Sequence, residues 1–361
     1  MLYEPLTLRS GAVLPNRLAL APLTNGQSLP DGRLGDDELA WLARCADGGF
    51  GLIETCAAYV GLDGKAWDGE LGVDRDDDLA GLGRLAARLR RGGGLAIVQL
   101  FHGGVRATQR LTGEQVWSAT TWHEDTPAFE VPRPATELDL ARVIEQFAAA
   151  AARCQAAGFD GVELHGAHGY LLSQFLSATM NSRGDRWGGG PAGRARLIRE
   201  VARAVRARCG RQFTVGVRLS LEDWGSARGL DLDDSLQVAR WLAEDGVDFV
   251  HASLWNAAAM TKKRPEQHAV PLLRAALPRD VAVIACGGVW TAADAVALRE
   301  RGADVVALGR AAICNPEWPI AARTPGWEPR RPPLTRAELV ERSISPVFIG
   351  YLARWKNFVA G

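Results

Sequence analysis

The sequence predicts an α/β protein built as a single (β/α)8 (TIM) barrel, in which eight parallel strands form a closed ring and helices cover it. Eight short apolar runs recur along the 361 residues. Runs of this length are typical of strands buried on both faces of a parallel sheet. Segments with helical periodicity separate most of the runs. Three stretches, AGFDGVEL, EDGVDFVHA and ERGADVVAL, also repeat one order of helix end, glycine, acidic residue and strand.

The strands and helices can be placed in chain order. Glycines at 158, 246 and 302 follow predicted helices in the position of a C-terminal cap. The predicted strands are 18–23, 51–56, 96–101, 161–166, 214–220, 249–254, 281–287 and 305–311. The predicted helices are 39–47, 79–91, 138–157, 192–208, 232–245, 270–277 and 292–301.

Three segments add to this alternation. Residues 2–17 predict a small hairpin before the first strand, and the Thr-, Trp- and Pro-rich stretch 107–136 predicts an elaborated loop after the third. No linker divides the chain, so we expect one domain over 1–361, with an aromatic tail (about 335–361) docked or at a homodimer interface. The alternative is an open doubly wound sheet. It would usually carry GxGxxG after the first strand, where this chain has APLTNGQS.

Composition and charge exclude several classes of protein. The chain is 47% hydrophobic and 23% charged, as in ordinary globular proteins. Its 42 basic and 42 acidic residues cancel, so no overall field favours nucleic acid or an anionic membrane. The six cysteines are scattered without a CxxC pair, which argues against an iron–sulfur cluster or structural zinc. We see no signal-peptide pattern or spanning segment, and therefore expect a cytoplasmic protein. From the cysteine spacing we expect no metal.

In a (β/α)8 barrel the active site lies at the carboxyl ends of the strands. Glycine-rich turns follow the seventh and eighth predicted strands, and a basic residue adjoins the second turn. Such turns let backbone N–H groups approach phosphate oxygens, and an arginine adds charge. The residues concerned are Gly287, Gly288, Gly309 and Arg310. The alternative is that they only form tight turns.

The fourth predicted strand ends in two imidazoles and a phenol. His165, His168 and Tyr170 could together bind a carbonyl oxygen and supply a proton. A structural role and a metal-binding pair are the alternatives. The other strand ends are short of the carboxylates that a metal site would need.

Two polar side chains stand in otherwise apolar strands. Arg218 needs an anionic partner to offset its desolvation, and Gln99 needs hydrogen-bond partners. A flat heteroaromatic ring with donors and acceptors on its edge would satisfy both. Pairing with side chains of neighbouring strands is the alternative for Gln99.

The motifs match a known family in order along nearly the whole chain. They include NRLALAPLT, QLFHGG, VGVRLS and VVALGRA, and the most specific is GVELHGAHGYLLSQFLS followed by NSRGDRWGG. On these residues the chain resembles the Old Yellow Enzyme family of flavin-dependent ene reductases, the NADH:flavin oxidoreductase group.

This resemblance implies FMN at the barrel mouth, reduced by NADH or NADPH, and hydride transfer to the β-carbon of an activated alkene. His165 and His168 would hold the substrate's activating oxygen, Tyr170 would donate the proton, and Phe101 would shape the substrate pocket. The implied FMN contacts are the backbone around Pro22 and Leu23, Thr24, Ala57 and Gln99 at the ring edge, Arg218 beside N1 and the C2 carbonyl, and Gly287, Gly288, Gly309 and Arg310 at the phosphate.

Some residues depart from the family pattern. Thr24 stands where some relatives carry cysteine, and Trp187 where tyrosine is frequent. The GGPAGRAR stretch lacks the acidic–amide pair that usually precedes its arginine. Tyr59 follows the second strand, either as a second phenol at the mouth or as a surface residue.

Other functions remain open from the sequence. The same flavin site could reduce nitro compounds, nitrate esters or quinones. A metal-dependent barrel hydrolase using His165 and His168, and a flavin-binding scaffold without catalysis, are alternatives from other classes.

Overall fold

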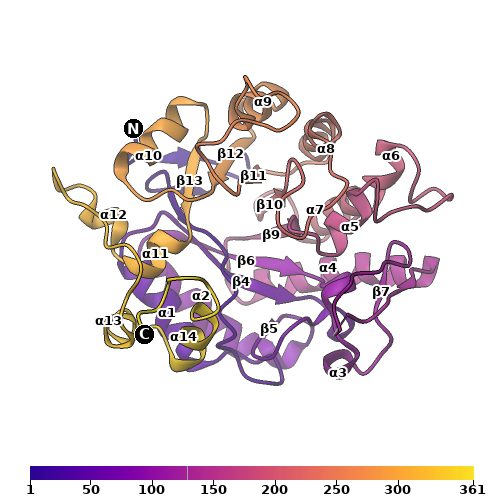
Figure 1. Cartoon of the computed structure of the whole chain (residues 1–361), viewed down its shortest axis with the longest axis horizontal. Helices are drawn as coiled ribbons and strands as arrows, with labels where there is room; N and C mark the ends of the chain where they lie inside the picture. Colours follow the sequence, from indigo (N-terminus) through magenta and orange to yellow (C-terminus); the bar gives the residue numbers. More distant parts are fainter. Residues whose placement is uncertain (128) are drawn as a thin grey trace.

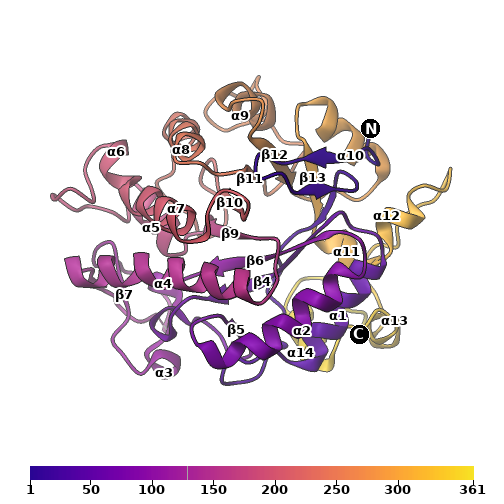
Figure 2. The same ribbon diagram turned by 180° about the vertical axis from the view of Figure 1, so that it is seen from behind.

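The computed structural model describes residues 1–127 and 129–361, and its centre is a closed barrel of parallel strands. β13 pairs with β3, and β3 pairs with β4, which closes the ring. Figures 1 and 2 show the helices arranged around these strands. In ring order the strands are β3 (Leu18–Leu20), β4 (Leu52–Tyr59), β6 (Leu95–Phe101), β9 (Gly161–Gly166), β10 (Thr214–Leu219), β11 (Phe249–Ser253), β12 (Ala282–Cys286) and β13 (Val305–Leu308).

The predicted (β/α)8 fold is confirmed, and the strand limits differ mainly in three places. β13 ends at Leu308, earlier than predicted, because the short helix α11 (Arg310–Cys314) begins two residues later. β3 ends at Leu20, earlier than predicted, because Pro22 has no N–H for a strand ladder. β4 runs to Tyr59, later than predicted, since the short strand β5 (Leu71–Gly72) pairs with its end.

The main helices lie between the strands as expected. The glycines at 158, 246 and 302 all have positive φ, as C-terminal capping requires. The helix predicted over 192–208 is two helices, which meet at Ala195. The helices are α1 (Asp36–Asp47), α2 (Leu79–Arg90), α4 (Glu137–Ala156), α6 (Pro191–Arg194), α7 (Arg196–Cys209), α8 (Leu232–Glu244), α9 (Ala269–Ala276) and α10 (Ala292–Glu300).

The amino-terminal hairpin closes the floor of the barrel. It consists of β1 (Leu6–Thr7) and β2 (Val13–Leu14), which pair antiparallel. Leu8 and Leu14 belong to the apolar cluster inside the barrel, together with Phe249 of β11. A Cβ at Gly216 of β10 would lie 1.9 Å from the Phe249 ring, so glycine makes room for that ring. The floor is therefore filled, and the opposite end is left for polar side chains.

Short elements complete the loops. In the stretch after β6, β7 (Trp117–Ser118) pairs with β8 (Arg133–Pro134), and α3 (Gln109–Thr112) precedes them. The remaining elements are η1 (Leu62–Gly64), η2 (Asp76–Asp78), η3 (Gly104–Arg106), α5 (Leu171–Leu176), α11 (Arg310–Cys314) and α12 (Trp318–Ala321).

The tail carries α13 (Arg336–Glu341) and α14 (Pro346–Leu352), and it packs on the body of the protein. The Ser345 N–H donates to Oε1 of Gln27, 3.3 Å away, which ties the start of α14 to the loop after β3. Among the residues described, no helix is both long and apolar enough to cross a bilayer.

Candidate active site

The parallel register brings the predicted polar side chains into neighbouring rows at the strand ends. Ala57, Gln99 and Glu163 are register partners across β4, β6 and β9. Arg218 of β10 is level with His165 on β9. Side chains two residues apart on a strand share a face, so Glu163 and His165 point the same way. The rows therefore stack along the barrel interior, with His165 and Arg218 nearer the mouth.

The two imidazoles and the phenol that the sequence singled out lie together. The ring centroid of His165 is 5.0 Å from that of His168 and 5.0 Å from that of Tyr170. The Phe101 ring packs edge-on against Tyr170 at 4.5 Å. His168 adopts a left-handed backbone conformation, with φ of 61°, which turns the chain sharply after β9. This turn brings all three side chains of the HGAHGY motif to one place.

Each imidazole has one ring nitrogen held by the protein. The Ala167 N–H donates to Nδ1 of His165 at 3.3 Å, so the hydrogen of the neutral ring resides on Nε2. Nε2 of His168 lies 2.6 Å from the Ser253 hydroxyl. These contacts fix both rings before any ligand arrives.

Burial decides the protonation states of the three groups. Burial, aided by repulsion from Arg218 and His251, holds the pKa of His168 well below its ordinary value, and the same applies to His165. Burial raises the pKa of Tyr170 to about 12. At neutral pH the cluster therefore presents two uncharged imidazoles and a protonated phenol.

Arg218 has unused hydrogen-bonding capacity at the mouth. Its Nη1 lies 3.5 Å from the Pro22 carbonyl oxygen and its Nη2 lies 3.3 Å from Cys286 Sγ. Its buried Nε has no acceptor among the described residues. A buried guanidinium with an unpaired N–H indicates a site for an acceptor.

Gln99 follows the alternative that the sequence left open. Its Nε2 donates to Oε1 of Glu163 at 2.7 Å, so a neighbouring strand satisfies the NH2 group. Within the described residues, no N–H or O–H group donates to Oε1 of Gln99. The amide is thus only half engaged by the protein.

The two glycine turns lie together beside an exposed arginine. Gly287 and Gly288 have φ of 143° and 67°, values that favour glycine. A Cβ at Gly288 would lie 3.7 Å from Nη2 of Arg310, and one at Gly309 would lie 3.3 Å from a methyl of Leu23. Arg310 is exposed and makes no ion pair within the described part of the chain. These features fit a phosphate.

Thr24 sits beside a residue that the sequence analysis missed. The phenol of Tyr351, on α14, lies close to the Thr24 hydroxyl. Tyr351 is half-buried and packs against the Trp355 ring at 5.6 Å. The tail thus contributes an aromatic side chain beside Thr24. In the sequence, the abundance of aromatic residues in the tail was the only indication of this contact.

Other conspicuous side chains lie away from this cluster. His102, which follows β6, is buried against Asp63 and the Trp117 ring. Tyr59 is buried, not at the surface, and its hydroxyl donates to the Asp31 carbonyl at 3.1 Å. Trp187 is also buried, and its indole N–H donates to Glu137 at 2.7 Å.

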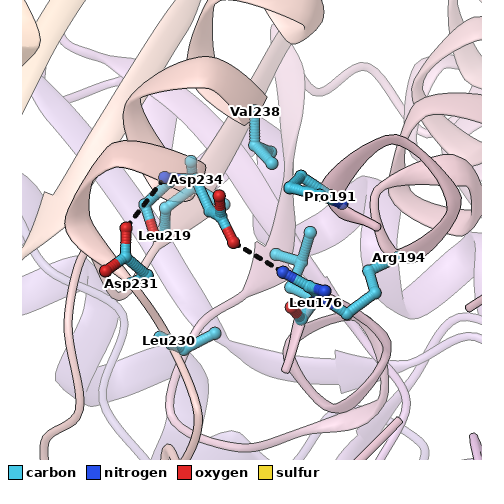
Figure 3. A pocket seen from close by; sticks show the side chains of 9 residues that line it. Leu176, Pro191, Arg194, Leu219, Leu230, Asp231, Asp234 and Val238 are labelled. Carbon is cyan, nitrogen blue, oxygen red and sulfur yellow. Dashed lines mark hydrogen bonds and ion pairs between the residues drawn. The ribbon is translucent and has the colours of Figure 1, made fainter. Parts of the chain in front are cut away.

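Arg194, in the stretch that departs from the family pattern, has a structural role. Its guanidinium bonds Asp234 at 2.5 Å and the Leu176 carbonyl at 3.0 Å. Figure 3 shows this ion pair near Asp231, which caps α8. The hollow that these residues line has a volume of about 10 Å³. The hollow is too small for a ring ligand.

A buried charged cluster lies below the mouth and was also missed. Nδ1 of His251 is 2.8 Å from Oε2 of Glu163 and 3.7 Å from Oε1 of Glu54. Burial and repulsion from Glu163 raise the pKa of Glu54 well above its usual range. Against the effect of burial, the Glu163 charge raises the pKa of His251 to about 10. The sequence signal for this cluster was one ionisable residue within each of three apolar strands, namely Glu54 in GLIETC, Glu163 in GVELHG and His251 in FVHASL.

The residues present fit FMN. Arg218 Nε and Gln99 Oε1 offer a donor and an acceptor for a ring edge. Arg310 and the two glycine turns offer a phosphate cradle. These residues would hold the group across the mouth.

Comparison with known proteins agrees with this geometry. The model of the NADH:flavin oxidoreductase / NADH oxidase family matches residues 1–324. The chain belongs to this family, the Old Yellow Enzyme group. The probable NADH-dependent flavin oxidoreductase YqiG of Bacillus subtilis is 33% identical, over 89% of this chain and 87% of that protein.

Two further members of this comparison are informative. NADH:fumarate oxidoreductase of Klebsiella pneumoniae is 32% identical over 88% of the chain, which spans about a third (35%) of that longer protein. The solved old yellow enzyme homologue of Zymomonas mobilis has the same fold, with a TM-score of 0.82 at 23% identity, over 95% of this chain and 96% of that one. The chain is therefore an enzyme of the NAD(P)H:flavin oxidoreductase family.

Proposed function

We propose that this flavin oxidoreductase is an FMN-dependent ene reductase that uses NADH or NADPH. The observation that carries the proposal is the meeting of two neutral imidazoles and a protonated phenol beside the Arg218 and Gln99 edge. When bound, FMN would take hydride from the nicotinamide and pass it to the β-carbon of an alkene conjugated to a carbonyl or similar group. The name of the Klebsiella relative pairs NADH with fumarate, an alkene of this kind.

His165 and His168 bind the activating oxygen of the substrate. Hydride addition places negative charge on that oxygen, so an N–H donor there stabilises the transition state more than the ground state. One such donor is worth roughly 3–4 kcal/mol. His165 Nε2 carries the available hydrogen because Nδ1 accepts from Ala167. For His168, the Ser253 hydroxyl orients the ring.

Tyr170 supplies the proton to the α-carbon from its Oη atom. A pKa of about 12 keeps the phenol protonated at neutral pH. Phe101 packs against this ring and limits its movement, since the two ring centroids are 4.5 Å apart.

The Arg218 guanidinium would stabilise negative charge at the N1 and C2 carbonyl edge of the ring, and Arg310 would pair with the phosphate. Thr24, with its hydroxyl beside Tyr351, would also contact the ring edge.

A metal-dependent hydrolase would need further metal ligands beside His165 and His168, and the described residues do not provide them. The only group of three potential metal ligands among the described residues is Glu54, Glu163 and His251, and it excludes His165 and His168. The second candidate function, reduction of nitro compounds, nitrate esters or quinones, would use the same flavin site.

An anaerobic titration tests the proposal. The purified protein is loaded with FMN and titrated with NADH and with NADPH while the visible spectrum is followed. It is then mixed with cyclohexenone, maleimide or a nitroaromatic, and the products are identified. We expect bleaching by a nicotinamide and formation of the saturated ketone or imide. Failure to bind FMN, or turnover of only the nitroaromatic, contradicts ene reduction.

A further inference from the structure

Glu163 lies between two side chains that have different tasks. Its Oε1 accepts from Nε2 of Gln99 at 2.7 Å, and its Oε2 faces Nδ1 of His251 at 2.8 Å. Glu163 and His251 are 0% exposed and Gln99 is 2% exposed. A hydrogen-bonded chain thus runs across the barrel interior from β6 through β9 to β11, directly below the mouth.

The hydrogen bond from Gln99 to Glu163 determines which end of the Gln99 amide is free. An amide has a donor end and an acceptor end that can exchange by rotation. Because the ionised carboxylate only accepts, it holds the NH2 end and leaves the carbonyl oxygen for a ligand. Without Glu163, either end could face the mouth.

The second buried glutamate differs from the first. Burial raises the pKa of Glu54 well above its usual range. For Glu163, burial is outweighed by the charges of His251 and Arg218 together with the hydrogen bonds from His251 and Gln99, so the pKa is lowered. Neither oxygen of Glu54 accepts a hydrogen bond among the described residues. Glu163 is therefore the charged group that engages Gln99, and Glu54 is a neutral neighbour on β4.

We propose that Glu163 is a positioning residue for the flavin, holding Gln99 so that its carbonyl oxygen meets an N–H on the ring edge, while His251 holds Glu163 in turn. This inference rests on the proposed binding of FMN. Glu163 itself would not contact FMN. It would affect the affinity for FMN only through the side-chain amide of Gln99.

A double-mutant cycle tests the transmission. The dissociation constant of FMN is measured for wild type, Glu163→Leu, Gln99→Leu and the double variant, with the melting temperature of each apoprotein as a folding check. We expect each single change to weaken FMN binding about tenfold, as the loss of one hydrogen bond does. The double variant should be no weaker than the weaker single one, because Glu163 acts through Gln99.

Glu54→Leu is the matched control. It removes a glutamate from the same cluster but leaves Gln99, Glu163 and His251 in contact, so FMN affinity should stay within about twofold of wild type. The visible absorption band of bound FMN should shift in the same direction in Glu163→Leu and Gln99→Leu, and should not shift in the control.

Several results would overturn the inference. These are wild-type affinity in Glu163→Leu, additive losses in the double variant, or an equal loss in Glu54→Leu. If Glu163→Leu does not fold, Glu163→Asp serves instead. It keeps the charge beside His251 but withdraws the oxygens from Gln99, so wild-type affinity in that variant would also overturn the inference. A wild-type protein that binds no FMN would instead refute the proposed function.

Discussion

Nε2 of His168 and Oγ of Ser253 lie 2.6 Å apart, which joins the turn after β9 to the end of β11. The contact passes across the end of β10, where the Ser220 hydroxyl accepts from the His168 N–H at 3.1 Å. The ring is thereby oriented in advance for a ligand.

Ser253→Ala should weaken the binding of phenolic ligands about five- to tenfold, since one neutral hydrogen bond contributes about 1 kcal/mol. The rate of FMN reduction by nicotinamide should not change. The measurement is the charge-transfer absorbance of the bound phenol during titration. Unchanged affinity would remove Ser253 from the orientation of His168.

His165→Ala removes a donor to the activating oxygen and should slow the alkene half-reaction by about 10²–10³-fold. Stopped-flow mixing of the reduced enzyme with cyclohexenone measures this rate, and full retention of phenol charge-transfer absorbance would contradict the assignment. His165→Asn, which keeps an N–H donor, is the control and should recover part of the rate.

The sequence predicted the site best where the residues are close together in the chain. His165, His168 and Tyr170 lie within six residues, and β9 has the predicted limits. The Gln99–Glu163 contact depends on the register between strands 64 residues apart, which no local pattern records. Tyr351 reaches Thr24 from the far end of the chain, for the same reason.

Strand parity explains the position of His102. Gln99 and Phe101 face the barrel interior, so the next residue along points outward, and His102 packs against Asp63 instead.

Arg310→Ala should weaken FMN binding about 10–100-fold, because a charged hydrogen bond to phosphate contributes about 1.5–3 kcal/mol. Riboflavin, which lacks the phosphate, provides the control and should bind both proteins equally. Equal losses for the two ligands would show that Arg310 does not pair with phosphate.

Thr24→Ala should slow flavin reduction and shift the flavin reduction potential, since the hydroxyl beside Tyr351 would contact the ring edge. Spectroelectrochemical titration and stopped-flow reduction with NADH measure the two quantities. Tyr351→Phe distinguishes a direct effect of Thr24 from loss of the tail contact, because it removes the partner and leaves the threonine. An unchanged potential and rate in Thr24→Ala would exclude the ring contact.

The pH dependence of the alkene half-reaction follows from Tyr170. A raised pKa of about 12 means that the phenol keeps its proton as pH rises through the neutral and mildly alkaline range, and loses it only near pH 12. We therefore expect the rate in wild type to stay flat from about pH 7 to pH 10. A decline centred near pH 8 or 9 would indicate a different donor.

The two half-reactions of Tyr170→Phe, measured separately by anaerobic stopped-flow spectroscopy, test the central claim most directly. The claim is that the phenol beside the paired imidazoles protonates the substrate above the flavin. The account predicts wild-type reduction of FMN by nicotinamide and a fall of at least tenfold in reoxidation by cyclohexenone. Equal losses in both half-reactions, or wild-type reoxidation by the enone, would contradict it.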